Sequence, residues 1–190
     1  MRFGPLARKP VATITRTIMQ QVKQSQINVA IIGVGLVGSE LIHQLLSIPQ
    51  NTTPFRLISL SSSTRTIFSP TRTIQPTDDW KSALAASTAG ADLHTLTELL
   101  SEHANAEERV AIVDNTSSDD VAALYPLWLE KGIHVVTPNK KAFSGDIGLY
   151  NKIVDASRAS GARYLNESTV GAGLPVINTL KELVGTGDKV

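Results

Sequence analysis

INVAIIGVGLVG, at residues 27–38, is the stretch that decides the fold. It opens with an almost wholly apolar run that ends at a glycine, and such a run is typical of a buried strand in a parallel sheet. Apolar residues then recur at helical spacing from Val37 to Ile48, where Pro49 is expected to stop the helix. The stretch therefore predicts a buried strand, a glycine turn and a helix in direct succession.

The same alternation continues to the end of the chain. Further apolar runs predict strands at 55–60, 110–113, 133–137 and 162–165. Helical patterns fall at 92–103, 118–131, 146–160 and 174–184, and Pro126 is expected to kink or restart the second of these helices. Residues 61–77 are rich in Ser, Thr and Pro, which predicts a loop. This order of elements favours an α/β domain with a Rossmann-like, doubly wound parallel sheet.

Gly33, Gly35 and Gly38 form the pattern G-x-G-x-x-G between the expected strand and the expected helix. In this context the first glycine permits a tight turn, the second lets the backbone approach a pyrophosphate, and the third lets the helix pack closely on the strand. The helix would begin at Leu36 and Val37, and a helix N-terminus attracts phosphate through its free N–H groups and its dipole. The pattern predicts a dinucleotide site at these five residues; the alternative is a glycine-rich turn without a ligand.

The residues after the second expected strand bear on the choice between NAD(H) and NADP(H). NAD-selective sites place an acid about 20 residues past the glycine loop, on the ribose hydroxyls. No Asp or Glu occurs between Glu40 and Asp78, and residues 61–65 are instead Ser-Ser-Ser-Thr-Arg. Hydroxyl groups and the Arg65 guanidinium suit a 2′-phosphate. The sequence favours NADP(H), or at least does not repel it; the alternative for Arg65 is a solvated loop arginine.

The composition narrows the classes of function. The chain of 190 residues has 18 Lys and Arg against 17 Asp and Glu, so it has no charge excess of the kind that binds nucleic acid. It has no cysteine, which excludes disulfides, thiolate metal sites and a cysteine nucleophile. No apolar run approaches the roughly 20 residues that a membrane helix needs. We therefore expect neither a nucleic-acid partner nor a membrane.

Two later strands are followed by unusually polar segments. Residues 114–118 are Asp-Asn-Thr-Ser-Ser, and residues 137–144 are Thr-Pro-Asn-Lys-Lys-Ala-Phe-Ser. Ligands of open α/β sheets bind at the carboxyl ends of the strands, where both segments would lie. Thr116 and Asp119 have the spacing of a capping box, a role that is compatible with a ligand contact. The lysine pair of the second segment is either solvated or placed to polarise a carbonyl beside a nicotinamide.

These segments resemble the homoserine dehydrogenase family. The resemblance rests on the glycine loop and on three blocks that follow it in order: VDNTSS at 113–118, TPNKKAFS at 137–144 and NESTVGAGLP at 166–175. The short stretch ahead of the glycine loop leaves no room for an aspartokinase, so the chain is similar to the monofunctional form. The resemblance implies reversible, NAD(P)H-dependent reduction of a small molecule, L-aspartate 4-semialdehyde, to L-homoserine, in threonine, methionine and isoleucine biosynthesis.

The resemblance also implies roles for particular residues. The glycine loop, Thr116 and Lys140 would contact the cofactor, and Lys140 would also lie near the reacting centre as a catalytic residue. A sodium ion, which as a hard cation prefers oxygen ligands, would be held by the main-chain carbonyls of Glu167, Val170, Ala172 and Leu174. From the residues alone, Gly171 and Gly173 indicate a turn before a helix that has Pro175 in its first turn.

Three segments are expected along the chain. Residues 1–26 form a basic extension without acids, typical of an organellar transit peptide or of a disordered tail. Residues 27–165 would be the NAD(P)-binding domain, and residues 166–190 the start of a truncated C-terminal substrate and dimerisation domain. The family's substrate-binding glutamate, proton-donating lysine and partner aspartate would lie beyond Val190, so we expect this chain to bind nucleotide without turnover.

Two alternatives to homoserine dehydrogenase remain at this point. One is another Rossmann dehydrogenase of amino-acid aldehydes, although aspartate-semialdehyde dehydrogenase is disfavoured because it needs a cysteine nucleophile. The other is a non-catalytic NAD(P)-binding fragment. The resemblance implies a cytoplasmic homodimer for the full-length form, whereas the basic extension favours an organelle; we expect the cytoplasm.

Overall fold

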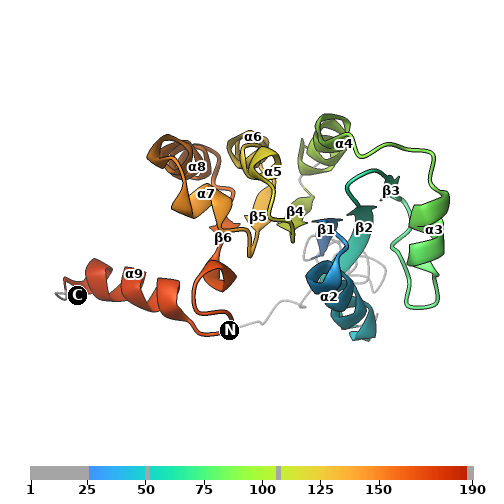
Figure 1. The fold of residues 1–190 in the computed structure, drawn as a ribbon, viewed down its shortest axis with the longest axis horizontal. Helices are drawn as coiled ribbons and strands as arrows, with labels where there is room; N and C mark the ends of the chain where they lie inside the picture. The colour runs from blue at the N-terminus through green and yellow to red at the C-terminus, as the bar shows by residue number, and fades with distance from the viewer. Residues whose placement is uncertain (1–25, 50–51, 106–107, 188–190) are drawn as a thin grey trace, which may run out of the picture.

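A computed structural model describes residues 26–49, 52–105 and 108–187. Within them, six strands form one sheet in the order β3-β2-β1-β4-β5-β6 (Figure 1). Neighbouring strands are parallel except β2 and β3, which are antiparallel. The strands are β1 (Ile27–Ile32), β2 (Phe55–Ser61), β3 (Thr66–Phe68), β4 (Arg109–Asp114), β5 (His134–Val136) and β6 (Tyr164–Leu165).

The strand order reverses at β1, which has β2 on one side and β4 on the other. Main-chain hydrogen bonds join the three strand ends: the N–H of Gly33 donates to the carbonyl of Ser61 at 2.9 Å, and the N–H of Asn115 donates to that of Ile32 at 2.8 Å. The carboxyl ends of β1 and β4 therefore form a topological switch point, where open α/β sheets bind their ligands.

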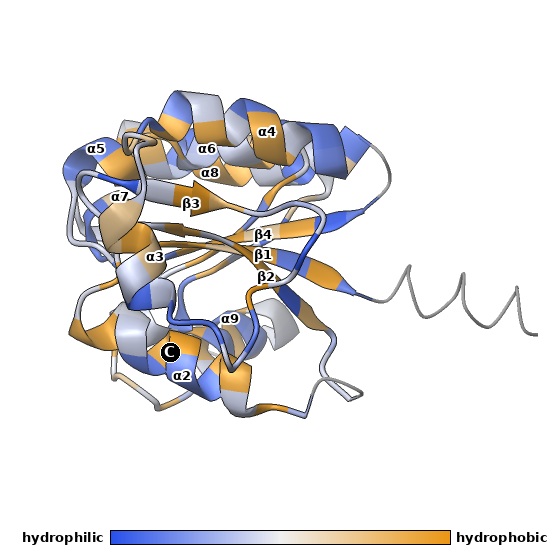
Figure 2. Ribbon diagram, turned by 90° about the vertical axis from the view of Figure 1, so that its right-hand side faces the viewer, coloured by the Kyte–Doolittle hydropathy of each residue, from blue (hydrophilic) through white to orange (hydrophobic). Residues whose placement is uncertain are grey.

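Helices flank the sheet on both faces (Figure 2). One face is covered by α4 (Leu93–Asn105), α5 (Asp119–Ala122), α6 (Tyr125–Glu130) and α8 (Ile147–Ser160), and α2 (Leu36–Ser47) lies on the other. The shorter α3 (Trp80–Ala86) contacts β3, and α7 (Lys141–Ser144) contacts α5 and α8. A 3-10 turn, η1 (Glu167–Thr169), and α9 (Val176–Thr186) follow β6.

The side chains of β1 alternate between two hydrophobic cores, as expected for a strand that is buried on both faces. Ala30 and Ile32 join the core beneath α4, α6 and α8, which includes the fully buried Trp128. Val29 and Ile31 join the second core, beneath α2. Each fully buried Ile or Leu side chain contributes about 1.5–3 kcal/mol to stability, so the central strand is held from both sides.

The face of the sheet that carries α2 is covered less completely than the other. Beside α2 lies an open, largely apolar groove of about 750 Å³, whose lining includes Ala111, Val113 and Val136. Three basic residues also line this groove, namely Arg109, His134 and Arg163. Burial, and then the positive charges of Arg163 and Arg109, lower the pKa of His134.

The structure confirms the expected fold class and most of the expected elements. The restart at Pro126 is confirmed, because this proline lies in the first turn of α6. The expectation that residues 61–77 are all loop is wrong, since β3 lies within them and pairs with β2. The short helices α3 and α7 were not expected.

The expectation that Thr116 and Asp119 form a capping box is also wrong. The N-cap of α5 is Ser118, whose Oγ accepts a hydrogen bond from the N–H of Val121 at 3.3 Å. Thr116 lies two residues earlier, and its Oγ1 accepts a hydrogen bond from the N–H of Ser118 at 3.2 Å. The hydroxyl of Thr116 therefore shapes the loop after β4 rather than the helix.

The C-terminal helix α9 stands apart from the sheet (Figure 1). None of its residues is buried; it contacts η1, and the ammonium group of Lys181 lies 5.4 Å from the ring centroid of Tyr164 in β6. The expected boundary at residue 166 stays a prediction, and the basic extension lies outside the described residues except for its last residue, 26. In the described ranges, no helix is both long and apolar enough to span a membrane.

We expect Gly38→Ala to unfold this domain or destabilise it severely. A Cβ at Gly38 would lie 1.9 Å from the carbonyl oxygen of Gly33, and backbone cannot yield as a flexible side chain can, so the cost should reach about 3 kcal/mol or more. The control is Gly185→Ala in α9, where a Cβ would meet nothing within 4 Å. Thermal unfolding should show a large loss for Gly38→Ala and none for Gly185→Ala; equal melting temperatures would contradict the close packing of α2 on β1.

Candidate nucleotide-binding site

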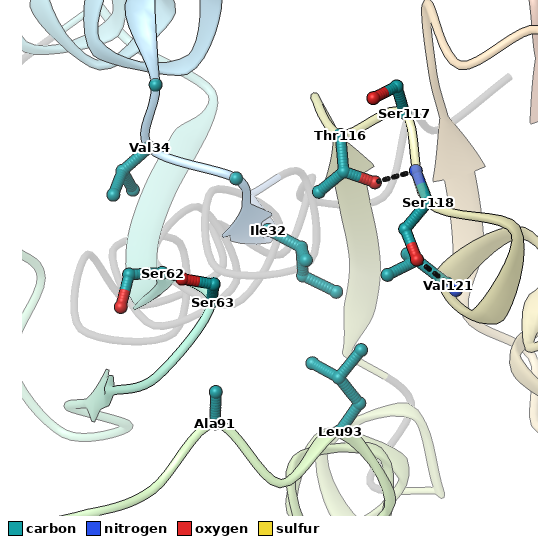
Figure 3. Close-up of a pocket in the computed structure, with 12 residues that line it drawn as sticks. Ile32, Val34, Ser62, Ser63, Ala91, Leu93, Thr116, Ser117, Ser118 and Val121 are labelled. Carbon is teal, nitrogen blue, oxygen red and sulfur yellow. Dashed lines mark hydrogen bonds between the residues drawn. The ribbon is translucent and has the colours of Figure 1, made fainter.

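A pocket of about 600 Å³ lies at the switch point of the sheet (Figure 3). The loops after β1, β2 and β4 form its walls. In Figure 3, Ser62 and Ser63 lie on one side of the pocket and Thr116 lies on the other, with Ala91 and Leu93 along a third side. The pocket therefore opens where the fold predicts a ligand.

The glycine loop forms one wall of this pocket through Gly33 and Gly35. Gly33 has a φ of 87°, and a Cβ there would lie 2.8 Å from Cγ2 of Thr116, so both its backbone conformation and its surroundings require glycine. Gly35 is the N-cap of α2, and a Cβ there would meet nothing within 4 Å. The protein itself thus leaves the space in front of Gly35 open.

The N-terminus of α2 faces this open space without a side-chain cap. The side chains of Leu36 and Val37 are 94% and 61% exposed, and neither lines the pocket. Any contribution of these two residues to a ligand therefore comes from their main-chain N–H groups, which have no partner in the preceding turn of an α-helix.

A second pocket of about 400 Å³ adjoins the first and shares Val34 and Ser62 with it. It is lined by two cations, Arg65 and Lys81. The Oγ of Ser62 accepts hydrogen bonds from the N–H of Arg65 at 2.9 Å and from that of Thr64 at 3.2 Å, which fixes the turn after β2. This pocket has the position and the charge for a phosphate on the adenosine ribose.

Lys81 was not identified from the sequence. It lies in the first turn of α3, a helix that was not expected, and its ammonium group lies 5.6 Å from the ring centroid of Trp80. Its place beside Arg65 depends on how α3 packs against β3, which no local pattern reveals.

The loop after β4 supplies the opposite wall. Thr116 lines the pocket, and its N–H donates to Oδ1 of Asp114 at 2.7 Å. The neighbouring Asn115 was not among the expected site residues. Its Nδ2 is buried and has no hydrogen-bond partner in the described part of the chain, and it lies close to the glycine loop, 3.5 Å from where a Cβ of Gly38 would be.

The structure does not bring Lys140 into either pocket. Lys140 is exposed at the N-cap of α7, in the loop after β5, so its contact with cofactor and substrate stays a prediction. Its neighbour Lys141 is not merely solvated, since its Nζ pairs with Oδ2 of Asp119 in α5 at 3.1 Å.

The expected sodium loop forms a tight turn between η1 and α9. Gly171 and Ala172 both have positive φ, 72° and 51°. The carbonyls of Glu167 and Leu174 each accept a main-chain hydrogen bond, which leaves each of them a second lone pair for a cation. These oxygen atoms are thus the kind of ligand that a hard cation prefers.

The Glu167 side chain has a role that the sequence did not reveal. It accepts hydrogen bonds from the N–H groups of Ile177 at 2.9 Å and Asn178 at 3.1 Å and so caps α9.

An open, mostly parallel sheet with a glycine turn and an uncapped helix N-terminus at its switch point defines a dinucleotide-binding domain of the Rossmann type. Within this class, the family model described as the NAD-binding domain of homoserine dehydrogenase matches residues 33–167. The chain therefore belongs to the homoserine dehydrogenase family, as its sequence motifs predicted.

Relatives and solved structures agree with this assignment. The chain is 45% identical over 168 residues to homoserine dehydrogenase from Emericella nidulans, with 86% of this chain and 45% of that protein covered. It is 40% identical to the Saccharomyces cerevisiae enzyme over 168 residues, with the same coverage. It thus spans about 45% of the length of these relatives.

Among solved structures, a Candida auris protein of unknown function is 40% identical, with a TM-score of 0.75 over 87% of this chain and 45% of that one. A hyperthermophilic archaeal homoserine dehydrogenase in complex with NADPH is 26% identical, with a TM-score of 0.63 over 84% of this chain and 50% of that one.

We expect Gly35→Val to abolish nucleotide binding while leaving the fold intact. The backbone at this position is extended and free of neighbours, so valine fits the protein but would occupy the space of a pyrophosphate. Affinity for NADPH and NADH should both fall by roughly a hundredfold or more. Titration of NADPH fluorescence, beside thermal unfolding of the same variant, measures both properties. A folded Gly35→Val variant with unchanged affinity would contradict the dinucleotide site.

Proposed function

We propose that this chain is the nucleotide-binding part of a homoserine dehydrogenase, which reversibly reduces L-aspartate 4-semialdehyde to L-homoserine with NAD(P)H. The observation that carries the proposal is the open space at Gly35, at the switch point of the sheet. Residues 33–167 of the chain, which include Gly35, match the model of this family. The bound nicotinamide supplies the hydride, and the residues of this chain hold the cofactor in place.

The roles of these residues follow from where they lie. The glycine loop and the N-terminus of α2 would bind the pyrophosphate, and the Thr116 loop, on the opposite wall of the pocket, would contact the nicotinamide half of the cofactor. Lys140, in the loop after the neighbouring β5, would add positive charge on the side where the substrate carbonyl gains electrons.

We propose NADP(H) as the preferred cofactor. Arg65 and Lys81 line the pocket that adjoins the pyrophosphate site, and two cations suit the doubly charged 2′-phosphate. The residues from 41 to 77 contain no acid that would bind the ribose hydroxyls of NAD(H). The archaeal relative solved with NADPH supports this choice.

We propose further that the carbonyls of Glu167, Val170, Ala172 and Leu174 hold a sodium ion. All four residues belong to one short loop that turns at Gly171 and Ala172, where φ is positive, and main-chain oxygens are suitable ligands for a hard cation. The homodimer and the cytoplasmic location implied by the resemblance stay predictions.

Single substitutions of the two cations should separate NADPH from NADH. We expect Arg65→Ala and Lys81→Ala each to weaken NADPH binding by about tenfold, the effect of losing one charge-assisted contact, and to leave NADH binding almost unchanged. Lys152→Ala, which removes an exposed cation of α8, is the matched control and should alter neither. Equal losses of affinity for NADPH and NADH would show that Arg65 and Lys81 do not bind the 2′-phosphate.

A chimera tests the proposed activity. Residues 27–165 of this chain would replace the matching segment of the Saccharomyces cerevisiae relative, and NADPH formation would be followed with L-homoserine at alkaline pH. We expect turnover, and none when the chimera also carries Gly35→Val. A folded chimera that binds NADPH but does not oxidise homoserine would favour a nucleotide-binding role without this activity.

A further inference from the structure

A buried carboxylate lies directly behind the nucleotide pocket. Asp114, the last residue of β4, has no exposed surface. Its Oδ1 accepts the N–H of Thr116 at 2.7 Å, and its Oδ2 accepts both the hydroxyl of Tyr125 at 2.5 Å and Nδ2 of Asn139 at 3.0 Å. Burying a carboxylate is costly unless it is hydrogen-bonded, and here both oxygens are engaged.

These bonds join two loops that are far apart in the sequence. Thr116 belongs to the loop after β4, and Asn139 belongs to the loop after β5, immediately before Lys140. Nδ2 of Asn139 also donates to the carbonyl of Ser118 at 3.0 Å. Thr137 completes the connection, because its Oγ1 donates to the carbonyl of Asp114 and accepts the N–H of Asn139, at 2.9 and 2.8 Å.

Tyr125 closes this network from the side of α6. It is fully buried, and its hydroxyl also lies 2.9 Å from Oγ1 of Thr137. Burial, and then the negative charge of Asp114, raise the pKa of Tyr125 far above its usual value. The phenol therefore keeps its proton and remains a donor to Asp114.

We propose that Asp114 is a positioning residue that sets the two loops at the nicotinamide end of the site, and this inference rests on the proposed function. One carboxylate oxygen fixes the Thr116 loop, and the other fixes the loop that carries Lys140. An amide at this position cannot do both. If the amide oxygen faced Thr116, the amide NH₂ would face the NH₂ of Asn139, which is also a donor. If the amide were turned round, its NH₂ would face the N–H of Thr116, again a donor.

The test compares ligands that reach different ends of the site. NADPH spans the whole site, whereas adenosine 2′,5′-bisphosphate lacks the nicotinamide half and reports on the end near Arg65 and Lys81. For Asp114→Asn, we expect the NADPH dissociation constant to rise about tenfold and that of the bisphosphate to stay within about twofold. The fluorescence of bound NADPH should also change, because it reports on the surroundings of the nicotinamide.

Two further variants keep the test decisive. Tyr125→Phe removes a donor to Asp114 without charge or backbone change, and it should show the same split between the two ligands if Asp114→Asn does not fold. Ser157→Ala is the matched control: it removes the hydrogen bond from Oγ of Ser157 to the carbonyl of Ala162, 2.7 Å long, in α8 of the same helical layer but away from both loops. It should lower the melting temperature and leave both affinities unchanged.

The outcomes are distinct. Equal losses of NADPH and bisphosphate affinity, or no loss of either in a folded variant, would overturn the positioning role and leave the nucleotide site standing. If the wild-type chain bound neither ligand, the proposed function would fail, and the role of Asp114 would fail with it.

Discussion

The contact between Gly38 and the carbonyl of Gly33 is the constraint on which the nucleotide site depends. Because no Cβ stands between them, α2 begins directly against the end of β1, at the switch point of the sheet. The same approach leaves the space before Gly35 open. The packing of α2 on the second core and the geometry of the phosphate site therefore depend on the same close contact. Gly33 provides the backbone conformation, Gly35 the space for a ligand, and Gly38 the close packing.

The loops that surround this contact are held in place in different ways. The glycine loop is shaped mainly by the conformations of its own glycines and by one main-chain hydrogen bond to Ser61. The loops after β4 and β5 are instead placed by Asp114, whose hydrogen bonds cross from one strand end to the next. The cations at the other end depend on a third arrangement, in which α3 brings Lys81 beside Arg65. In this chain, therefore, both ends of the site depend on contacts between segments that are distant in the sequence.

This division also explains what the sequence could predict. The strand, glycine turn and helix at residues 27–48 were foreseen because only certain residues satisfy that geometry, and the restart at Pro126 follows from its missing N–H. β3 was missed because a short edge strand needs little apolar surface, and Thr and Ser in a polar segment suggest a loop. Lys81 and the partners of Asp114 were missed because their places depend on contacts between distant segments, which leave no local pattern.

The separation of α9 from the sheet has a consequence for motion. This helix buries none of its residues, so its opening leaves both hydrophobic cores intact. Opening β1 would disrupt both cores and its hydrogen bonds to β2 and β4. The segments that open first are those whose opening costs the least free energy. Amide hydrogens of α9 therefore exchange with solvent early, and those of β1 exchange only when the whole domain unfolds. The domain therefore carries a gradient of kinetic protection that falls from its centre towards its C-terminal helix.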